Sequence, residues 1–277
     1  MGMQVNTNIA ANNAYRNLAT TQNDLSKSLE KLSSGLRINR AADDAAGLAI
    51  SEGLKSQVGG LTVASRNAQD AVSVIQTAEG SLNEVTSILQ RMRDLAVQAG
   101  NDSNNAQSRA AITTEADALT EELSRIGTST NFNGINLLDS SAGTAGVMSF
   151  QIGANTADQI TVDLTGADVA TVVTGLGTLD FSTSTGAAAA ITAIDDQVTA
   201  VSTARADLGA VQNRFESVIK NIAVSKENLT AAGSRIRDTD MAEEMVKYTR
   251  SNILQQAGTA MLAQANQSNQ GVLQLLR

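Results

Sequence analysis

Three adjacent pairs of carboxylates are the residues of this chain best suited to acid–base chemistry. The pairs are Asp43–Asp44, Asp195–Asp196 and Glu243–Glu244. Two carboxylates that converge on one point can act as general acid and general base. Adjacent residues on a helix point in diverging directions instead. We therefore expect the three pairs to be solvated surface groups or helix caps.

Histidine and cysteine are absent from all 277 residues. This excludes a Ser-His-Asp triad, a cysteine nucleophile, an H-E-x-x-H zinc site and a disulfide. No phosphate-binding glycine motif follows a predicted strand. The sequence predicts a protein that is not an enzyme and that needs no cofactor or metal.

The charge is acidic overall and unevenly distributed. The net charge is −8 with a sequence pI of about 4.6, which disfavours nucleic-acid binding. Residues 1–40 carry five basic and two acidic side chains, and residues 234–277 carry five and four. All of the excess negative charge thus lies between residues 41 and 233, which indicates different environments for the ends and the middle.

Long helices are the elements that position the charged residues of this chain. From Asp43 to Gly100 there is no proline, and apolar or small residues recur at steps of three and four, which is the period of a helix packed along another helix. A cleaner stripe starts at Ile191 and continues to Leu229, and a shorter helix is predicted for residues 107–126. The fold class predicted is mainly α, with a long antiparallel coiled-coil rod.

Candidate caps, glycines and loop segments between these helices set the expected boundaries of the elements. Asp43 or Asp44 is a candidate cap for the long helix, and Gly59–Gly60 inside it marks a kink or a close backbone approach. Residues 127–148 are interpreted as loop, residues 149–164 as a β-hairpin, and residues 165–187 as a short variable loop. Gly233 is expected to end the second long helix.

Both ends of the chain carry stripes at coiled-coil spacing, which predicts a terminal two-helix coiled coil. The last stretch, 251–276, has no charged residue, yet 12 of its 26 residues are Ser, Thr, Asn or Gln, which argues against a membrane span. One chain offers too few helices to cover both stripes, so we expect the ends to be disordered in the monomer and to fold on self-association. The alternative is a pair of ordinary surface helices. The candidate self-assembly residues are Leu18, Leu25, Leu29, Leu32, Leu36, Leu254, Met261, Val272 and Leu275.

Several longer motifs resemble bacterial flagellin, the subunit of the flagellar filament. They are LSSGLRINRAADDAAGLAIS at 32–51, LQRMRDLAVQ at 89–98, NFNGINLL at 131–138, FQIGAN at 150–155, LGAVQNRFES at 208–217, SRIRDTDMAEEM at 234–245 and QAGTAMLAQANQ at 256–267. They span both ends in the family's order. The short middle implies a form without large outer domains.

The resemblance implies a layout and a set of partners. Residues 1–42 with 234–277 would form the inner-tube terminal helices, and residues 43–233 the outer-tube rod. The implied partners are copies of the same chain, a flagellar export chaperone, and cap and hook-associated proteins, and the implied location is the secreted, extracellular filament. A hook–filament junction protein of the same architecture is the alternative. A zinc peptidase insertion, present in some members of the family, is excluded by the absence of histidine.

The resemblance also implies a receptor-contact surface. Flagellins with the LQRMRDLAVQ segment are ligands of vertebrate Toll-like receptor 5, and by motif position the contacts would be Arg91 and Leu95, supported by Glu115. The alternative interpretation is that Arg91 is a solvated helix residue and Leu95 a core or subunit-interface residue.

Overall fold

The computed structural model describes residues 8–275, and side chains are placed for residues 8–267. The chain divides into two compact units. One combines both chain ends, up to Ser56 and from Asn228, and the other is Gln57–Glu227. Both boundaries fall inside helices, whereas the family resemblance implied boundaries near residues 42 and 233. No helix among the described residues is long and apolar enough to cross a membrane.

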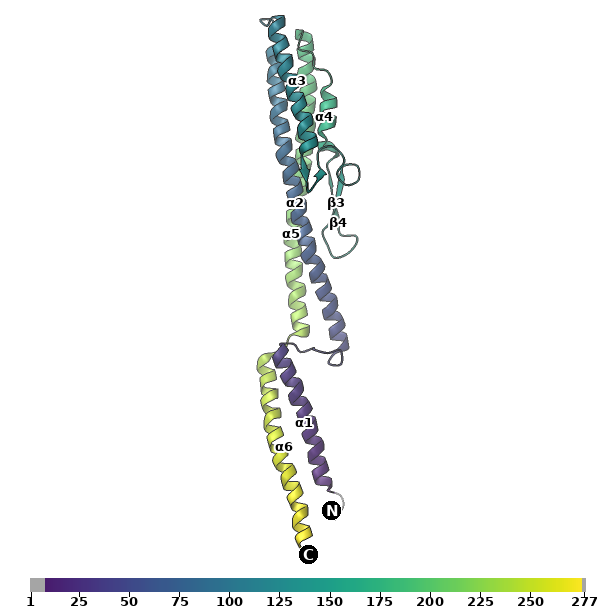
Figure 1. The fold of residues 1–277 in the computed structure, drawn as a ribbon, viewed down its shortest axis with the longest axis vertical. Coiled ribbons are helices and arrows are strands. Elements are labelled where there is room, and N and C mark those ends of the chain that lie inside the picture. The colour runs from purple at the N-terminus through teal and green to yellow at the C-terminus, as the bar shows by residue number, and fades with distance from the viewer. Residues whose placement is uncertain (1–7, 276–277) are drawn as a thin grey trace. The chain divides into compact units, whose positions relative to one another are not determined.

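The first unit is built on two antiparallel helices, α1 (Ile9–Ser34) and α6 (Met241–Leu275), which lie side by side (Figure 1). The chain leaves α1 at Gly35, whose left-handed backbone (φ 72°) lets its N–H bond to the Lys31 carbonyl. The next residues pair with the segment that precedes α6. The Arg37 N–H donates to the Arg237 carbonyl at 2.6 Å, and the Thr239 N–H donates to the Gly35 carbonyl at 3.0 Å. These backbone bonds fix α1 against α6 at one end.

Two of the three carboxylate pairs lie near this junction. The prediction of solvated groups or caps holds for Asp43–Asp44, but Glu244 is only 5% exposed and is not a cap, which contradicts the prediction for that residue. Helix α2 (Ala45–Ala99) begins with the Gly47 N–H bonded to the Asp44 carboxylate at 2.8 Å. The Asp43 carboxylate accepts the N–H groups of Arg40 (2.9 Å) and Asn39 (3.1 Å), which lowers the pKa of Asp43. The other such pair, Glu243–Glu244, lies in the first turn of α6, where negative charge is favourable.

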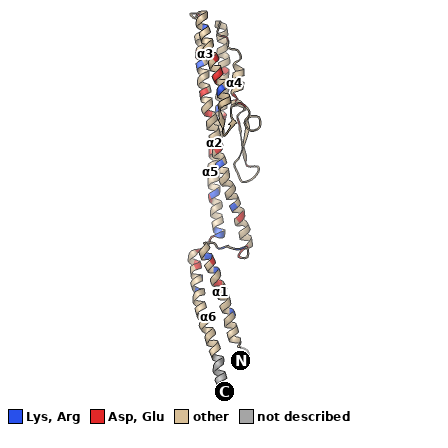
Figure 2. Ribbon diagram, in the orientation of Figure 1, with Lys and Arg blue, Asp and Glu red and all other residues tan. Residues whose placement is uncertain are grey.

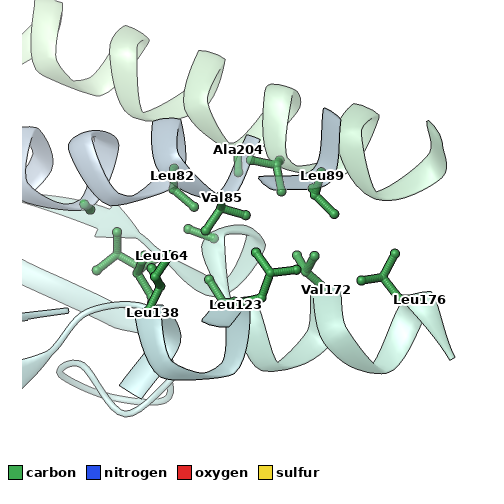
Figure 3. Packing of buried hydrophobic residues seen from close by; sticks show 14 of the residues in the cluster. Leu82, Val85, Leu89, Leu123, Leu138, Leu164, Val172, Leu176 and Ala204 are labelled. Atoms are coloured by element: carbon green, nitrogen blue, oxygen red, sulfur yellow. The ribbon is translucent and has the colours of Figure 1, made fainter. Parts of the chain in front are cut away.

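The second unit packs α2 against α3 (Ala106–Ser129) and α5 (Ser184–Arg237). Ion pairs give the directions of the helices. Arg93 on α2 pairs with Asp195 on α5 at 2.6 Å, and Glu79 pairs with Arg205 at 3.7 Å, so α2 and α5 are antiparallel. Their stripes enclose one apolar core (Figure 3), which includes Leu82, Val85, Leu89, Leu123, Leu138, Leu164, Val172, Leu176 and Ala204. The predicted mainly α fold is confirmed.

The predicted hairpin is present. It consists of β3 (Val147–Gln151) and β4 (Gln159–Asp163), paired antiparallel. The Phe150 ring meets the Phe215 ring of α5 edge-on, at 5.9 Å between centroids. A smaller hairpin, β1 (Asn131–Phe132) with β2 (Ile135–Asn136), corrects the interpretation of residues 127–148 as loop. Its turn is Asn133–Gly134, both with positive φ, which is the sequence signature that the loop interpretation overlooked.

The interpretation of residues 165–187 as a loop is wrong. A 3-10 turn at Thr165–Ala167 is followed by α4 (Val169–Leu176), and α5 already begins at Ser184. Val169, Val172, Leu176 and Phe181 from this segment are buried in the core. The Asp168 carboxylate caps α4 by accepting the Ala170 N–H at 2.9 Å. An apolar run this short has no resolvable period, so only its burial reveals it.

Gly233 does not end α5, which continues to Arg237. A single glycine costs about 1 kcal/mol in a helix interior, and a helix of 54 residues tolerates that. Gly60 in α2 does mark a close approach, as predicted. A Cβ added there would lie 3.1 Å from the Ala154 Cβ, whereas a Cβ at Gly59 would meet nothing within 4 Å.

These two glycines provide a matched test of the packing between α2 and the β3–β4 turn. Gly59→Ala should raise the free energy of unfolding by about 1 kcal/mol, because only helix propensity changes. Gly60→Ala should gain clearly less or lose stability, because Ala154 must move. Chemical denaturation of both variants measures the difference. Equal gains would contradict the close approach.

The buried 165–187 segment provides a second test. Phe181→Ala should lower the free energy of unfolding by about 3–5 kcal/mol, because a fully buried aromatic side chain is replaced by a cavity. Thr178→Ala, at an exposed neighbour, is the control and should change stability by less than about 0.5 kcal/mol. Similar denaturation curves for the two variants would show that the segment is not part of the core.

Candidate assembly and receptor-contact surfaces

The interface between α1 and α6 is a heptad seam. On α1, the half-buried leucines Leu18, Leu25 and Leu32 point toward α6, and Ser28 between them is buried. Three of the predicted leucines therefore lie on the interface between α1 and α6. Leu29 lies off the seam, and 54% of its surface is exposed.

The face that α6 turns toward α1 is mostly polar or small, with Tyr248 and Leu262 as its two large members, so a search for apolar stripes alone misses it. Its members begin at the buried Glu244 and follow at alternating steps of four and three residues, and this spacing is the sequence signal that could have identified them. They are Glu244, Tyr248, Ser251, Gln255, Gly258, Leu262 and Ala265. The Gln255 amide donates to the Gln22 side-chain oxygen at 2.5 Å, and the Asn8 amide donates to the Ala265 carbonyl at 2.9 Å. A Cβ on Gly258 would lie 3.2 Å from Leu18, so this glycine permits the close packing of the two helices.

Most of the large apolar residues of α6 are therefore left on its outer surface, with Leu262 in the seam as the exception. Leu254 and Met261, two of the candidate self-assembly residues, do not face α1 and are 52% and 65% exposed. They flank the seam and line an open groove between the two helices together with Leu18. A second open groove runs along α6 itself, lined by Met245, Val246, Ile253 and Leu254 with Thr249 and Arg250. We call these exposed residues the outer face of α6, with Met241 at its start.

The charges of α6 are confined to its first turns. Lys247 lies 2.9 Å from Glu243, whose hydrogen bond raises the pKa of Lys247, and 3.7 Å from the buried Glu244. From Ser251 onward the described part of the helix has no charged residue (Figure 2). The side chains of Val272 and Leu275 lie outside the described residues. Leu36 is half-buried and forms an isolated bridge with Asp238.

The three residues of the suggested receptor contact lie in the second unit. Arg91 on α2 and Glu115 on α3 form an ion pair at 2.6 Å, with 55% and 45% of their side chains exposed. Arg91 offers both its Nε and Nη2 hydrogens to one carboxylate oxygen. An exposed pair of this kind contributes little to stability, so both groups remain available to a partner.

Leu95 differs from these two residues. It is 2% exposed and belongs to the core cluster of α2, α3 and α5. The structure therefore brings Arg91 and Glu115 together at the surface and places Leu95 beneath it. This matches the alternative interpretation of Leu95 as a core residue, and it excludes direct contact with a partner in this conformation.

No group of acidic residues in the described part of the chain is arranged to hold a metal ion. Asp195, in the third carboxylate pair, is engaged by Arg93 across the α2–α5 interface, with the Nε and Nη2 atoms each bonding one oxygen.

The fold defines a class: a mainly α protein with two small hairpins, in which the first and last described helices form one antiparallel pair. Two family descriptions match the sequence, the bacterial flagellin N-terminal helical region over residues 5–143 and the bacterial flagellin C-terminal helical region over residues 191–276. A flagellin of Halalkalibacterium halodurans is 55% identical over 99% of this chain and all of its own length. A flagellin of Bacillus subtilis is 48% identical with the same coverage. The chain belongs to the bacterial flagellin family.

Solved structures agree with this assignment. The crystal structure of Bacillus cereus flagellin superimposes with a TM-score of 0.51 at 32% identity, over 61% of this chain and 94% of the other. A putative flagellar hook-associated protein from Vibrio parahaemolyticus gives 0.58 at 14% identity, over 71% and 100%. The second likeness shows the shared fold alone.

Proposed function

We propose that this protein is a subunit of the extracellular flagellar filament and that its terminal helices are the assembly device. The outer face of α6 carries the argument. It exposes Ile253, Leu254 and Met261 on a helix whose inward face is already occupied by α1. Such a surface needs a partner, and the family membership of the whole chain identifies the partner as further copies of the same chain.

The distribution of charge also supports a role of the terminal unit in assembly. Residues 57–227 contain 19 acidic and 9 basic side chains, whereas the remaining residues contain 9 acidic and 11 basic. Repulsion between the acidic units keeps free subunits soluble, and the nearly neutral terminal unit can pack closely with its neighbours. Association then buries aliphatic surface at roughly 25 cal/mol per Å², which offsets the entropy of ordering the helices.

Export and capping partners follow from membership of the family. We propose that a chaperone holds the terminal segments before export, that the chain passes out unfolded, and that cap and hook-associated proteins guide its addition to the filament. The absence of cysteine and proline suits threading and rapid refolding, since neither disulfide exchange nor slow X-Pro isomerisation intervenes. The terminal helices are proposed to be disordered in the free subunit and to become ordered on assembly.

Charge on the exposed leucine and methionine should block filament growth. Leu29→Asp or Met261→Asp should raise the critical concentration at least tenfold, because each places a carboxylate in a surface that assembly buries. Leu29→Met and Met261→Leu are the controls and should grow normally. Seeded assembly is followed by light scattering and electron microscopy, with circular dichroism confirming that the helices of residues 57–227 persist.

The outcomes of that experiment separate the alternatives. Growth of the Asp variants at wild-type concentrations would contradict the role of these surfaces. Failure of the unmodified chain to form long filaments from seeds, with short oligomers only, would favour the hook–filament junction protein.

A second candidate function is recognition by Toll-like receptor 5. It is favoured by the exposed Arg91–Glu115 pair, whose position on the two neighbouring helices matches the surface implied by LQRMRDLAVQ. Because Leu95 is buried, its contribution would be to hold α2 in place beneath Arg91.

The receptor proposal has a matched control on the same helix. Arg91→Ala or Glu115→Ala should lower the potency of the monomer in a receptor reporter assay at least tenfold, since an arginine or glutamate in a buried contact is worth more than about 1.4 kcal/mol. Arg93→Ala removes an arginine of similar exposure, paired with Asp195, and should leave potency unchanged. Equal losses for Arg91→Ala and Arg93→Ala would show a general charge effect instead of a defined contact.

A further inference from the structure

The methionines of this chain are unevenly placed. Five lie among the residues whose side chains are described. Met92 is fully buried in α2, and Met148 is half-buried in β3. The other three, Met241, Met245 and Met261, are all on α6 and are 48–65% exposed. The accessible thioethers of the described residues are thus concentrated on one helix.

These three methionines belong to the outer face of α6. Met245 lines the groove along α6 beside Val246 and Ile253, and Met241 lies one turn before it on the same side of the helix. Met261 lines the groove between α1 and α6 beside Leu18. Leu254 contributes to both grooves, which joins them into one apolar surface. The thioethers therefore lie within the surface that the proposed function buries.

Oxidation would change this surface without changing the fold. Hydrogen peroxide transfers one oxygen to a thioether sulfur: the O–O bond breaks, an S=O bond forms, the sulfur loses two electrons and water leaves. The product is a polar methionine sulfoxide, which enzymes can reduce again. On an exposed side chain the added oxygen is solvated and costs little. In a dry subunit contact it would have to be desolvated.

We propose that Met241, Met245 and Met261 form a peroxide-sensitive site that controls assembly of this chain. Their oxidation in the free subunit blocks association through the outer face of α6, and burial in the assembled polymer protects them. This inference rests on the proposed function as a self-assembling subunit.

The buried Met92 is an internal reference for the rate of methionine oxidation. The rate at which peroxide oxidises a thioether follows its exposure, so Met92 should react far more slowly than the α6 methionines in the folded monomer. Met241→Leu, Met245→Leu and Met261→Leu combined remove the sulfurs while conserving side-chain volume and apolar character. This triple variant tests the site without removing the apolar surface.

The experiment compares the wild-type chain and the triple variant, each treated with hydrogen peroxide as monomer, then desalted and seeded. Peptide mass mapping locates the added oxygens. Oxidised wild type should show a critical concentration at least about tenfold higher, because burial of a single methionine side chain corresponds to roughly a tenfold step. The oxidised triple variant should assemble as before, and treatment of the oxidised wild type with a pair of methionine sulfoxide reductases should restore growth.

Each outcome is informative. If untreated wild type assembles and oxidised wild type assembles equally well despite sulfoxides on α6, the peroxide-sensitive site is overturned and the filament function stands. If the triple variant is inhibited as strongly as wild type, the sensitive groups lie elsewhere and the assignment is also overturned. If untreated wild type fails to assemble, the proposed function falls and the inference with it.

Discussion

The constraint on which the terminal unit depends is that α6 cannot bury its two faces against a single partner helix. Its polar and small face, with Gln255 and Gly258, is occupied by α1, and its apolar face is left in solvent. A pair of helices is near the limit of what is stable in water even with an apolar seam. The leucines of α1 supply the apolar side of this seam, while Gln255 and Gly258 fix its register. This exposed face is the basis of the proposal that other subunits cover α6.

The second unit faces no such constraint. Residues 57–227 enclose a continuous core from α2, α3, α4, α5 and both hairpins, with Phe181 and Phe215 fully buried. Its surface ion pairs, such as Arg93–Asp195, orient the helices without contributing much free energy. This unit can be folded and acidic in the free chain, while the ends stay available. The acidic unit is thus the one with its own closed core, and the nearly neutral terminal unit is the one whose surface is proposed to be covered by assembly.

Periodicity was sufficient to predict the long elements. The extents of α2 and α3 were predicted within three residues at each end, and Asp43 or Asp44 was named as the cap, because a stripe and a carboxylate are local signals. The long helix α5 extends seven residues before and eight residues beyond its predicted stripe, because its ends carry no such signal. The buried segment 165–187 and the Asn133–Gly134 hairpin were missed, since short elements are defined by what covers them. At the sites, Arg91 and Glu115, named from the family resemblance, do form a pair, whereas the polar and small residues with which α6 faces α1 were not predicted. A search for apolar stripes assumes that the nearest helix takes the apolar face.

That assumption fails here for a physical reason. If α1 covered Leu254 and Met261, the free subunit would be more stable, but its remaining surface would be polar and would have little to gain from association. Turning Gln255 and the buried Glu244 toward α1 retains the apolar side chains for contacts between subunits. On the proposed function, an exposed Leu or Met destabilises the monomer, and its burial between subunits stabilises the polymer. Sequence pattern alone cannot distinguish such a residue from a core residue. The same placement leaves the thioethers of α6 open to water until a neighbour covers them.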